Sequence, residues 1–201
     1  MTMTRKTIGI DYSLTTPAIC VCNGDFEFKN CKFYYLTNVN KYSGDWIKED
    51  TLGVRQEGKF NHWLINGRLH LPYTSQTERH DQISSWALRV IPNTNNNIFI
   101  EGYSYGSKGL VFNLAENMGT LKHKLYKANK EVRIIVPGVI KKLATGKGNA
   151  NKVKMYEQFV KDTGVDLMKL YEQKKLNNPV TDIVDSFYVA KAGYYGAKST
   201  K

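Results

Sequence analysis

Ile8-Gly9-Ile10-Asp11-Tyr12-Ser13 is a short apolar run that ends in a carboxylate, and it decides the fold class of this 201-residue chain. Ile98-Phe99-Ile100-Glu101-Gly102 repeats the pattern, with three apolar residues before a glutamate. Short isoleucine-rich runs favour buried strands, and each strand delivers its last side chain at its carboxyl end. In sheets with parallel strands, ligands bind at that end. The pattern therefore predicts an α/β sheet that carries Asp11 and Glu101 at one edge.

Four further runs rich in β-branched and aromatic residues predict strands. They lie at 18–21, 26–28, 32–36 and 132–136. The first three follow the opening strand with turn signals between them, so they predict an antiparallel β-meander. The stretch 37–73 is irregular and polar. We interpret it as an insertion with little regular structure.

Apolar residues at helical spacing predict helices that pack against this sheet. They are expected at about 75–90, 110–125, 138–144, 151–162 and 181–192. Ser75 and Glu78 form a capping-box pattern at the start of the first one. The order of strands and helices predicts a mixed α/β sheet with helices on both faces. We expect a single domain over residues 1–201.

The composition indicates a polyanionic partner. The chain has a net charge of +11, which suits nucleic acid first and an anionic membrane surface second. No stretch approaches the ~18 apolar residues of a spanning helix, and the first residues show no signal-peptide core. We therefore expect a cytoplasmic protein without membrane association. Three cysteines without Cys-x-x-Cys spacing argue against a disulfide framework and a zinc site.

Two more carboxylates, Asp182 and Asp185, are three residues apart at the start of the last expected helix. That spacing places both on one helix face. If they meet Asp11 and Glu101, the repulsion among four carboxylates requires divalent cations. Oxygen ligands select Mg²⁺ or Mn²⁺, and two such ions could support phosphodiester hydrolysis. Taken singly, Asp11 also fits a strand-end turn, and Asp182 fits a helix N-terminus.

Five lysines lie in or beside a glycine-rich loop at 145–149. They are Lys141, Lys142, Lys147, Lys152 and Lys154, and the first four are the candidates for DNA binding. The glycines let the backbone approach a phosphate while the lysines supply positive charge, so DNA contacts are expected here. A solvated basic face is the alternative. The spacing is not that of a nucleotide-binding P-loop, so no nucleotide cofactor is expected.

Tyr103, Tyr105 and Lys108 follow the second acidic segment directly, among glycines and serines. Two tyrosines and a lysine in such a loop could stack on unpaired bases at a DNA branch point. We therefore expect these three residues to contact DNA. The alternative is that one or both tyrosines simply pack against the rest of the protein.

Together, these segments resemble the RuvC-type Holliday junction resolvases, a family of the ribonuclease H-like superfamily. Gly9-Ile10-Asp11 resembles the first acidic motif of that family, and Ile100-Glu101 resembles the second. Asp182-x-x-Asp185 resembles the final acidic helix. The segment 137–152, which contains the pattern T-G-x-G-x-A-x-K, resembles the basic segment and is the most specific match.

The resemblance implies a ribonuclease H-like fold. It also implies a metal-dependent endonuclease that resolves Holliday junctions or other branched DNA in recombination and repair. The catalytic, metal-binding acids would be Asp11, Glu101, Asp182 and Asp185, holding two Mg²⁺ ions for which Mn²⁺ could substitute. Lys141 and Lys152 match positions that contact DNA phosphates. The family further implies a homodimer, and the divergent sequence would suit a phage-type member in a bacterial or phage-infected cell.

Other functions stay open at this point. One is a broader structure-selective nuclease for forks, flaps or RNA–DNA hybrids, and another is a non-catalytic junction-binding protein. A third is a basic protein that coats nucleic acid without specificity. The apolar stripe within 110–125 fits a dimer interface and a monomer core equally well.

Overall fold

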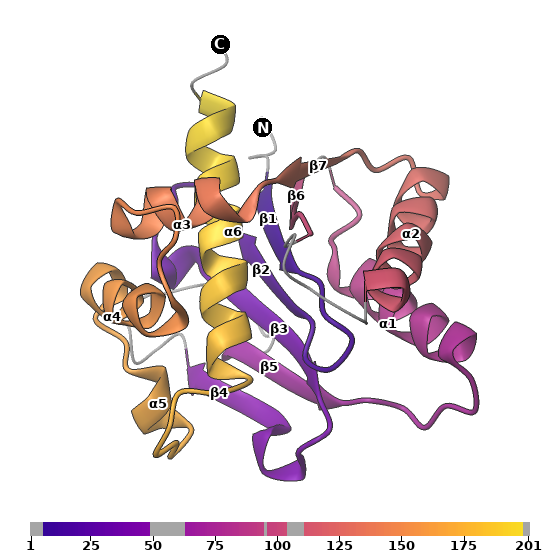
Figure 1. Cartoon of the computed structure of the whole chain (residues 1–201), viewed down its shortest axis with the longest axis horizontal. Coiled ribbons are helices and arrows are strands. Elements are labelled where there is room, and N and C mark those ends of the chain that lie inside the picture. Colours follow the sequence, from indigo (N-terminus) through magenta and orange to yellow (C-terminus); the bar gives the residue numbers. More distant parts are fainter. Residues whose placement is uncertain (1–5, 49–62, 95, 104–110, 199–201) are drawn as a thin grey trace.

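The computed structural model describes residues 6–48, 63–94, 96–103 and 111–198 (Figure 1). Within these ranges the chain forms a seven-stranded sheet in the order β4-β5-β3-β2-β1-β6-β7. The strands are β1 Lys6–Asp11, β2 Ala18–Cys22, β3 Cys31–Thr37, β4 Gly44–Lys48, β5 Trp63–Leu69, β6 Asn96–Glu101 and β7 Val132–Ile135. β1, β2 and β3 pair in antiparallel fashion, whereas β6 is parallel to both β1 and β7. The predicted mixed sheet is confirmed.

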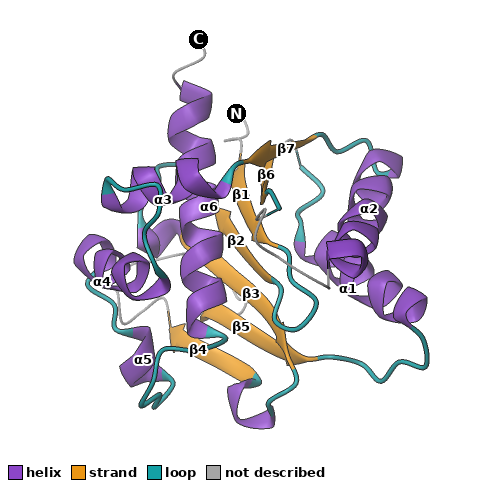
Figure 2. Ribbon diagram, viewed as in Figure 1, coloured by secondary structure: helices purple, strands orange, loops and turns teal. Residues whose placement is uncertain are grey.

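Helices pack on both faces of this sheet (Figure 2). One face carries two helices, α1 Gln76–Val90 and α2 Val111–Lys127. The other carries α3 Pro137–Thr145, α4 Lys152–Thr163 and α6 Val180–Lys198, with the short α5 Leu167–Leu170 beside them. Each face has its own cluster of buried apolar side chains. No helix in the described ranges has the length and apolar character needed to cross a membrane.

The strand expected at 26–28 is not formed. Phe28–Asn30 instead adopt a 3-10 turn, η1. The backbone bonds locally here, because the Glu27 amide donates to the Asp25 carbonyl and the Asn30 amide donates to the Glu27 carbonyl. The Phe26 ring packs 5.1 Å from the Phe187 ring of α6, measured between centroids. Side-chain packing under α6 therefore replaces strand pairing in this segment.

The stretch 37–73 is more regular than its sequence predicts. After a 3-10 turn, η2 Asn40–Tyr42, the strands β4 and β5 extend the sheet beyond β3. β5 is parallel to β3 and antiparallel to β4. Its polar centre hides the strand pattern, and Gly67 leaves space that the Tyr35 ring fills. The interpretation as an irregular insertion is therefore wrong for 44–48 and 63–69, and 49–62 lies outside the described residues.

The apolar stripe of α2 belongs to the core. Met118, Leu121 and Leu125 are buried, and Leu114 packs against the same cluster as α1 and the sheet. Leu110 lies outside the described residues. These contacts favour the core interpretation of the stripe over a dimer interface.

The position of α6 depends on a close approach to β1. A Cβ at Gly9 would lie 2.5 Å from the carbonyl oxygen of Ser186 and still closer to the amide nitrogen of Ala190. Gly193, further along α6, lies in the same way against the ring of Phe99. Glycine at both places lets the helix backbone rest on the sheet. The first turns of α6 are thereby held over the carboxyl end of β1.

Candidate active site

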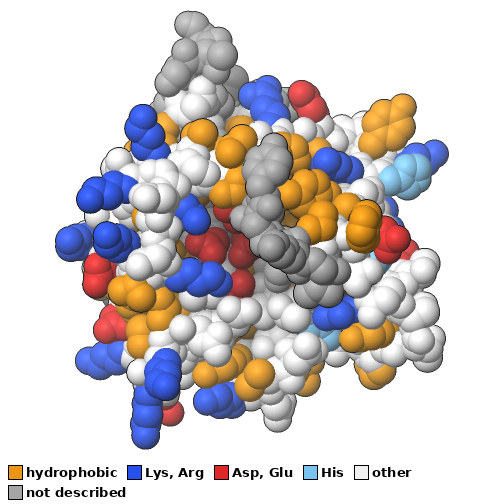
Figure 3. All heavy atoms as spheres, in the orientation of Figure 1, with side chains coloured by type: hydrophobic (Ala, Val, Ile, Leu, Met, Phe, Trp, Pro, Cys, Tyr) orange, Lys and Arg blue, Asp and Glu red, His pale blue; other side chains and the backbone are white. Residues whose placement is uncertain are grey.

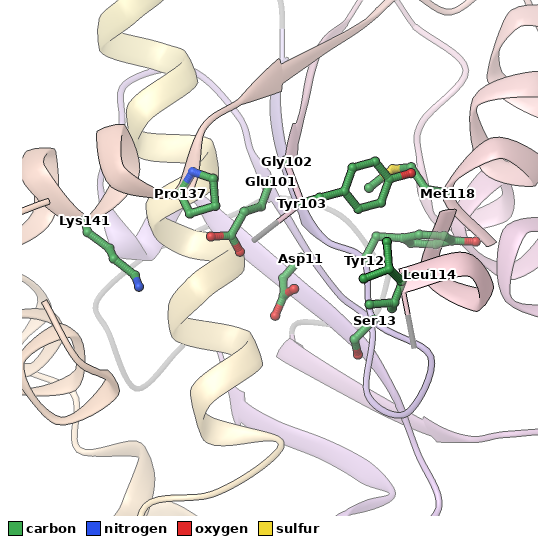
Figure 4. A pocket seen from close by; sticks show the side chains of 11 residues that line it. Asp11, Tyr12, Ser13, Glu101, Gly102, Tyr103, Leu114, Met118, Pro137 and Lys141 are labelled. Carbon is green, nitrogen blue, oxygen red and sulfur yellow. The ribbon is translucent and has the colours of Figure 1, made fainter. Parts of the chain in front are cut away.

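Asp11 and Glu101 lie side by side at the ends of neighbouring strands. Ile10 of β1 is opposite Ile100 of the parallel strand β6, so the next residue of each strand points to the same side. Figure 4 shows both carboxylates at one cavity, beside α6. The sheet therefore brings together two acids that are distant along the chain.

The third and fourth acids come from α6. Asp182 is in the first turn of the helix and only 4% exposed, and Asp185 is partly buried one turn later. Because Gly9 allows α6 to rest on β1, both aspartates lie near the strand ends. All four predicted acids thus meet in one cluster. Figure 3 shows acidic side chains in a hollow of the surface, with basic side chains beside them.

Hydrogen bonds fix the start of α6 relative to the loop that follows Asp11. The side-chain amide of Asn178 donates to Thr16 Oγ1 at 3.1 Å. The backbone amide of Thr16 in turn donates to Ser13 Oγ at 3.0 Å. This chain of contacts connects the segment before α6 to the loop after β1. It restricts the relative movement of the two segments that carry acids.

Burial raises the pKa of every carboxyl group in the cluster, and repulsion by neighbouring acids raises the pKa of Asp11, Glu101 and Asp182 further. Burial is the largest cause at each residue, and it raises the pKa of Asp185 to about 6, of Glu101 to about 7 and of Asp182 to about 8. The pKa of Asp11 is raised well above its usual value, first by burial and then by the charges of the other three acids. These groups can hold several negative charges at neutral pH only with the help of cations.

The oxygen atoms of the cluster suit a hard cation. Asp182 Oδ2 is buried and has no hydrogen-bond partner, which is costly unless a cation or a proton satisfies it. In the described ranges, however, no three His, Cys, Asp or Glu side chains form a ready-made set of metal ligands. The four carboxylates of the cluster interact electrostatically all the same. A metal at this site is therefore a proposal that rests on donor chemistry.

Lys141 and Lys152 are the lysines that act on this cluster. The charge of Lys152 lowers the pKa of all four acids, and that of Lys141 lowers the pKa of Glu101 and Asp185. Both lysines line a cavity of about 180 Å³ together with Glu101 and Asp185. Positive charge therefore lies beside the acids and offsets part of their negative charge.

Local backbone structure places these two lysines. Gly146 caps the C-terminus of α3 and has the left-handed φ of 78° that favours glycine. Asn151 caps the N-terminus of α4, and its side chain accepts from the Lys154 amide. The turn between the two helices is tight, since a Cβ at Gly148 would lie 3.2 Å from the Gly138 carbonyl oxygen. The other two lysines predicted to bind DNA, Lys142 and Lys147, are exposed to solvent.

A second cavity, of about 240 Å³, opens beside Asp11 and Glu101. Tyr103, which is 44% exposed, lines it, as does Lys141. Tyr103 is thus placed at the site, as its sequence position predicts. Tyr105 and Lys108 lie outside the described residues.

Sequence reasoning missed several residues of this second cavity. They are Tyr12, Ser13, Leu114, Met118 and Pro137. The position of Tyr12 and Ser13 directly after Asp11 was a signal that could have identified both. Leu114 and Met118 carry no such signal, because their helical spacing is that of any core stripe.

The arrangement of sheet and helices matches solved structures of RuvC from Thermus thermophilus. RuvC alone has a TM-score of 0.57 and 16% identity, with 97% of this chain and 96% of that chain covered. RuvC in complex with a Holliday junction substrate has a TM-score of 0.58 and 14% identity, with the same coverage. The chain has a RuvC-like fold. No protein-family model and no curated protein sequence matches it.

The raised pKa values predict how stability changes with pH. An acid whose pKa is raised by folding holds its proton longer in the folded state, so the free energy of unfolding falls as pH rises toward the raised pKa. Asp182, with a pKa of about 8, keeps this effect active between about pH 7 and 8. His70 and His80 have lowered pKa values and act in the opposite direction, but only below about pH 6.5.

We therefore expect the metal-free protein to be less stable at pH 8 than at pH 7. The difference is up to about 1.4 kcal/mol for each carboxyl group that is protonated in the folded state and ionised in the unfolded state. Urea denaturation in EDTA at the two pH values measures the difference. Asp182→Asn should reduce it. A free energy of unfolding that stays constant or rises over this interval would contradict the proposed repulsion.

Proposed function

We propose that this protein is a Mg²⁺-dependent endonuclease that cuts Holliday junctions and related branched DNA. The observation that carries the proposal is the convergence of four carboxylates from three distant segments, with Lys141 and Lys152 beside them. Two further facts support it, namely the net charge of +11 and the likeness in fold to a RuvC that was solved with a Holliday junction.

The acids would hold two divalent ions. Asp11 with Asp182 and Asp185 would bind one, and Asp11 with Glu101 would bind the other. Mg²⁺ fits because every donor is a carboxylate oxygen, and Mn²⁺ could substitute. Bound there, the ions would lower the pKa of a water nucleophile and stabilise the departing 3′ oxygen.

The other roles belong to side chains of the chain itself. Lys141 and Lys152 are placed to hold the phosphate that is cut, as their shared cavity with Glu101 and Asp185 suggests. Their positive charge also lowers the pKa of these acids, which favours the ionised form that a metal requires. Gly9 and the hydrogen bonds of Asn178 would hold α6 in the position relative to β1 that brings the acids together. We further propose that two copies act as a homodimer, so that a junction is nicked symmetrically.

A cleavage assay tests this function. Wild-type protein is incubated with a four-way junction, a replication fork, an RNA–DNA hybrid and a linear duplex, each with Mg²⁺ and with EDTA. We expect Mg²⁺-dependent cutting of the junction at paired, symmetric positions. Equal cutting of junction, fork and hybrid would favour a broader structure-selective nuclease. Tight junction binding without cutting would favour a junction-binding protein.

The lysine pair gives a separate prediction about binding. Lys141→Ala and Lys152→Ala should each weaken junction binding and lower the slope of log affinity against log salt by roughly 0.9 for each phosphate that is no longer neutralised. Lys127→Ala, in the last turn of α2, is the matched control and should leave the slope unchanged. Fluorescence anisotropy at several salt concentrations measures the slopes. Identical slopes for all three variants and the wild type would exclude phosphate contacts at Lys141 and Lys152.

A further inference from the structure

The cavity beside Asp11 and Glu101 has two chemically different sides. Figure 4 shows the carboxylates and Lys141 on one side, and Tyr12, Leu114 and other uncharged side chains on the other. Metal ions and phosphates require the charged side. The apolar side is therefore available to contact another part of a bound molecule.

The size of the cavity limits what that part can be. Its volume is about 240 Å³, whereas an apolar protein cavity of about 150 Å³ already admits benzene. Pockets for drug-sized ligands begin at about 300 Å³. The cavity is therefore large enough for one planar ring system and smaller than the usual site of a drug-sized ligand. A single group of a larger molecule fits best.

The lining side chains suit a nucleobase. The aromatic rings of Tyr12 and Tyr103 and the apolar chains of Leu114 and Met118 offer flat and apolar contacts, which stacking bases use regardless of sequence. Ser13 adds a polar group, and its oxygen is held by the Thr16 amide at 3.0 Å, so its hydroxyl can donate toward a base edge. A base attached to a phosphate at the carboxylates is the nearest ring that could reach this wall.

We propose that this cavity receives one unpaired nucleobase of the strand that is cut, an inference that rests on the nuclease function proposed above. Removing a base from a paired duplex costs a few kcal/mol, whereas a base at a branch point is already partly free. The cavity would therefore favour branched over linear DNA through the unpaired base. Leu114 and Met118 would act as specificity-determining residues without touching the reacting atoms.

Base fluorescence tests the proposal without requiring cleavage. Asp11→Asn protein is bound to four-way junctions that carry 2-aminopurine at one position at a time around the exchange point. We expect fluorescence to rise on binding at one position per cut strand, because the base there leaves its stack. An abasic site at that position should weaken binding by about 5- to 150-fold, which corresponds to the ~1–3 kcal/mol of one stacked base.

A cavity-filling variant links the signal to this site. Leu114→Phe in the Asp11→Asn protein should remove the fluorescence rise and weaken junction binding, with no further loss on abasic DNA. Tyr126→Ala is the control, since Tyr126 lies on the same helix and is 76% exposed. The abasic experiment uses no cavity variant, so it remains decisive if Leu114→Phe does not fold.

Two results would overturn the base-binding proposal. One is the absence of a fluorescence rise at every position, and the other is unchanged affinity for abasic junctions. Cleavage by wild-type protein is measured separately. Cutting without a fluorescence change would reject the base pocket and leave the nuclease function intact. A fluorescence change without Mg²⁺-dependent cutting would reject the nuclease function, and with it the role of the cavity in cutting.

Discussion

Asp11→Asn is expected to reduce Mg²⁺-dependent cleavage of a four-way junction by about 10³-fold or more while junction binding is retained. Asp11 is the acid on which the other three act electrostatically, and in the proposed site it contacts both ions. Losing it would remove several kcal/mol of charge stabilisation in the transition state. Single-turnover cleavage measures the rate, and fluorescence anisotropy measures binding. Unchanged cutting would exclude Asp11 from catalysis.

The same substitution should stabilise the metal-free protein. Burial and three neighbouring carboxylates raise the pKa of Asp11, so a neutral side chain of the same shape relieves an unfavourable charge. We expect a higher melting temperature for Asp11→Asn than for wild type in EDTA at pH 8. Glu157→Gln, which removes one charge from an exposed position of α4, is the control and should change little. A lower melting temperature for Asp11→Asn would contradict the repulsive cluster.

Gly9→Ala is expected to lower the free energy of unfolding by about 3 kcal/mol or more. The added Cβ would collide with the backbone of α6 at Ser186 and Ala190, which cannot move aside as a side chain could. The helix would have to move away from β1. Asp182 and Asp185 would move with it, so cleavage should fall as well.

Gly119→Ala provides the matched control for that substitution. Gly119 lies within α2, and a Cβ there would meet nothing within 4 Å. Alanine should therefore stabilise the helix by about 0.5–1 kcal/mol. Urea denaturation of both variants gives the comparison. Equal stability of Gly9→Ala and wild type would mean that α6 does not rest on β1 as described.

The acidic cluster could be predicted because its signals are local. β1 and β6 each combine an apolar run with a terminal acid, and parallel strands share one edge. Asp182 and Asp185 have helical spacing, which fixes their common face. The helix N-cap at Ser75 could also be predicted from a local pattern, and its side chain accepts a hydrogen bond from the Glu78 amide as expected.

The remaining features depend on contacts between distant segments. β5 was missed because polar residues at its centre interrupt the apolar pattern of a strand, although it pairs with β3. The need for glycine at position 67 is visible only in the structure, where the Tyr35 ring occupies the space of a Cβ. Leu114 and Met118 line the cavity only because α2 packs next to the loop after β1. No local pattern contains this information. Sequence therefore predicted which acids lie together better than it predicted the shape of the space around them.

A crystal structure with bound Mn²⁺ would test most directly whether the four acids form one metal site. Anomalous scattering identifies each ion independently of the protein atoms. We expect two ions, one between Asp11 and the pair Asp182 and Asp185, and one between Asp11 and Glu101. Protein that remains without ions at these carboxylates in excess Mn²⁺, or that binds Mn²⁺ only elsewhere, would contradict the proposed site.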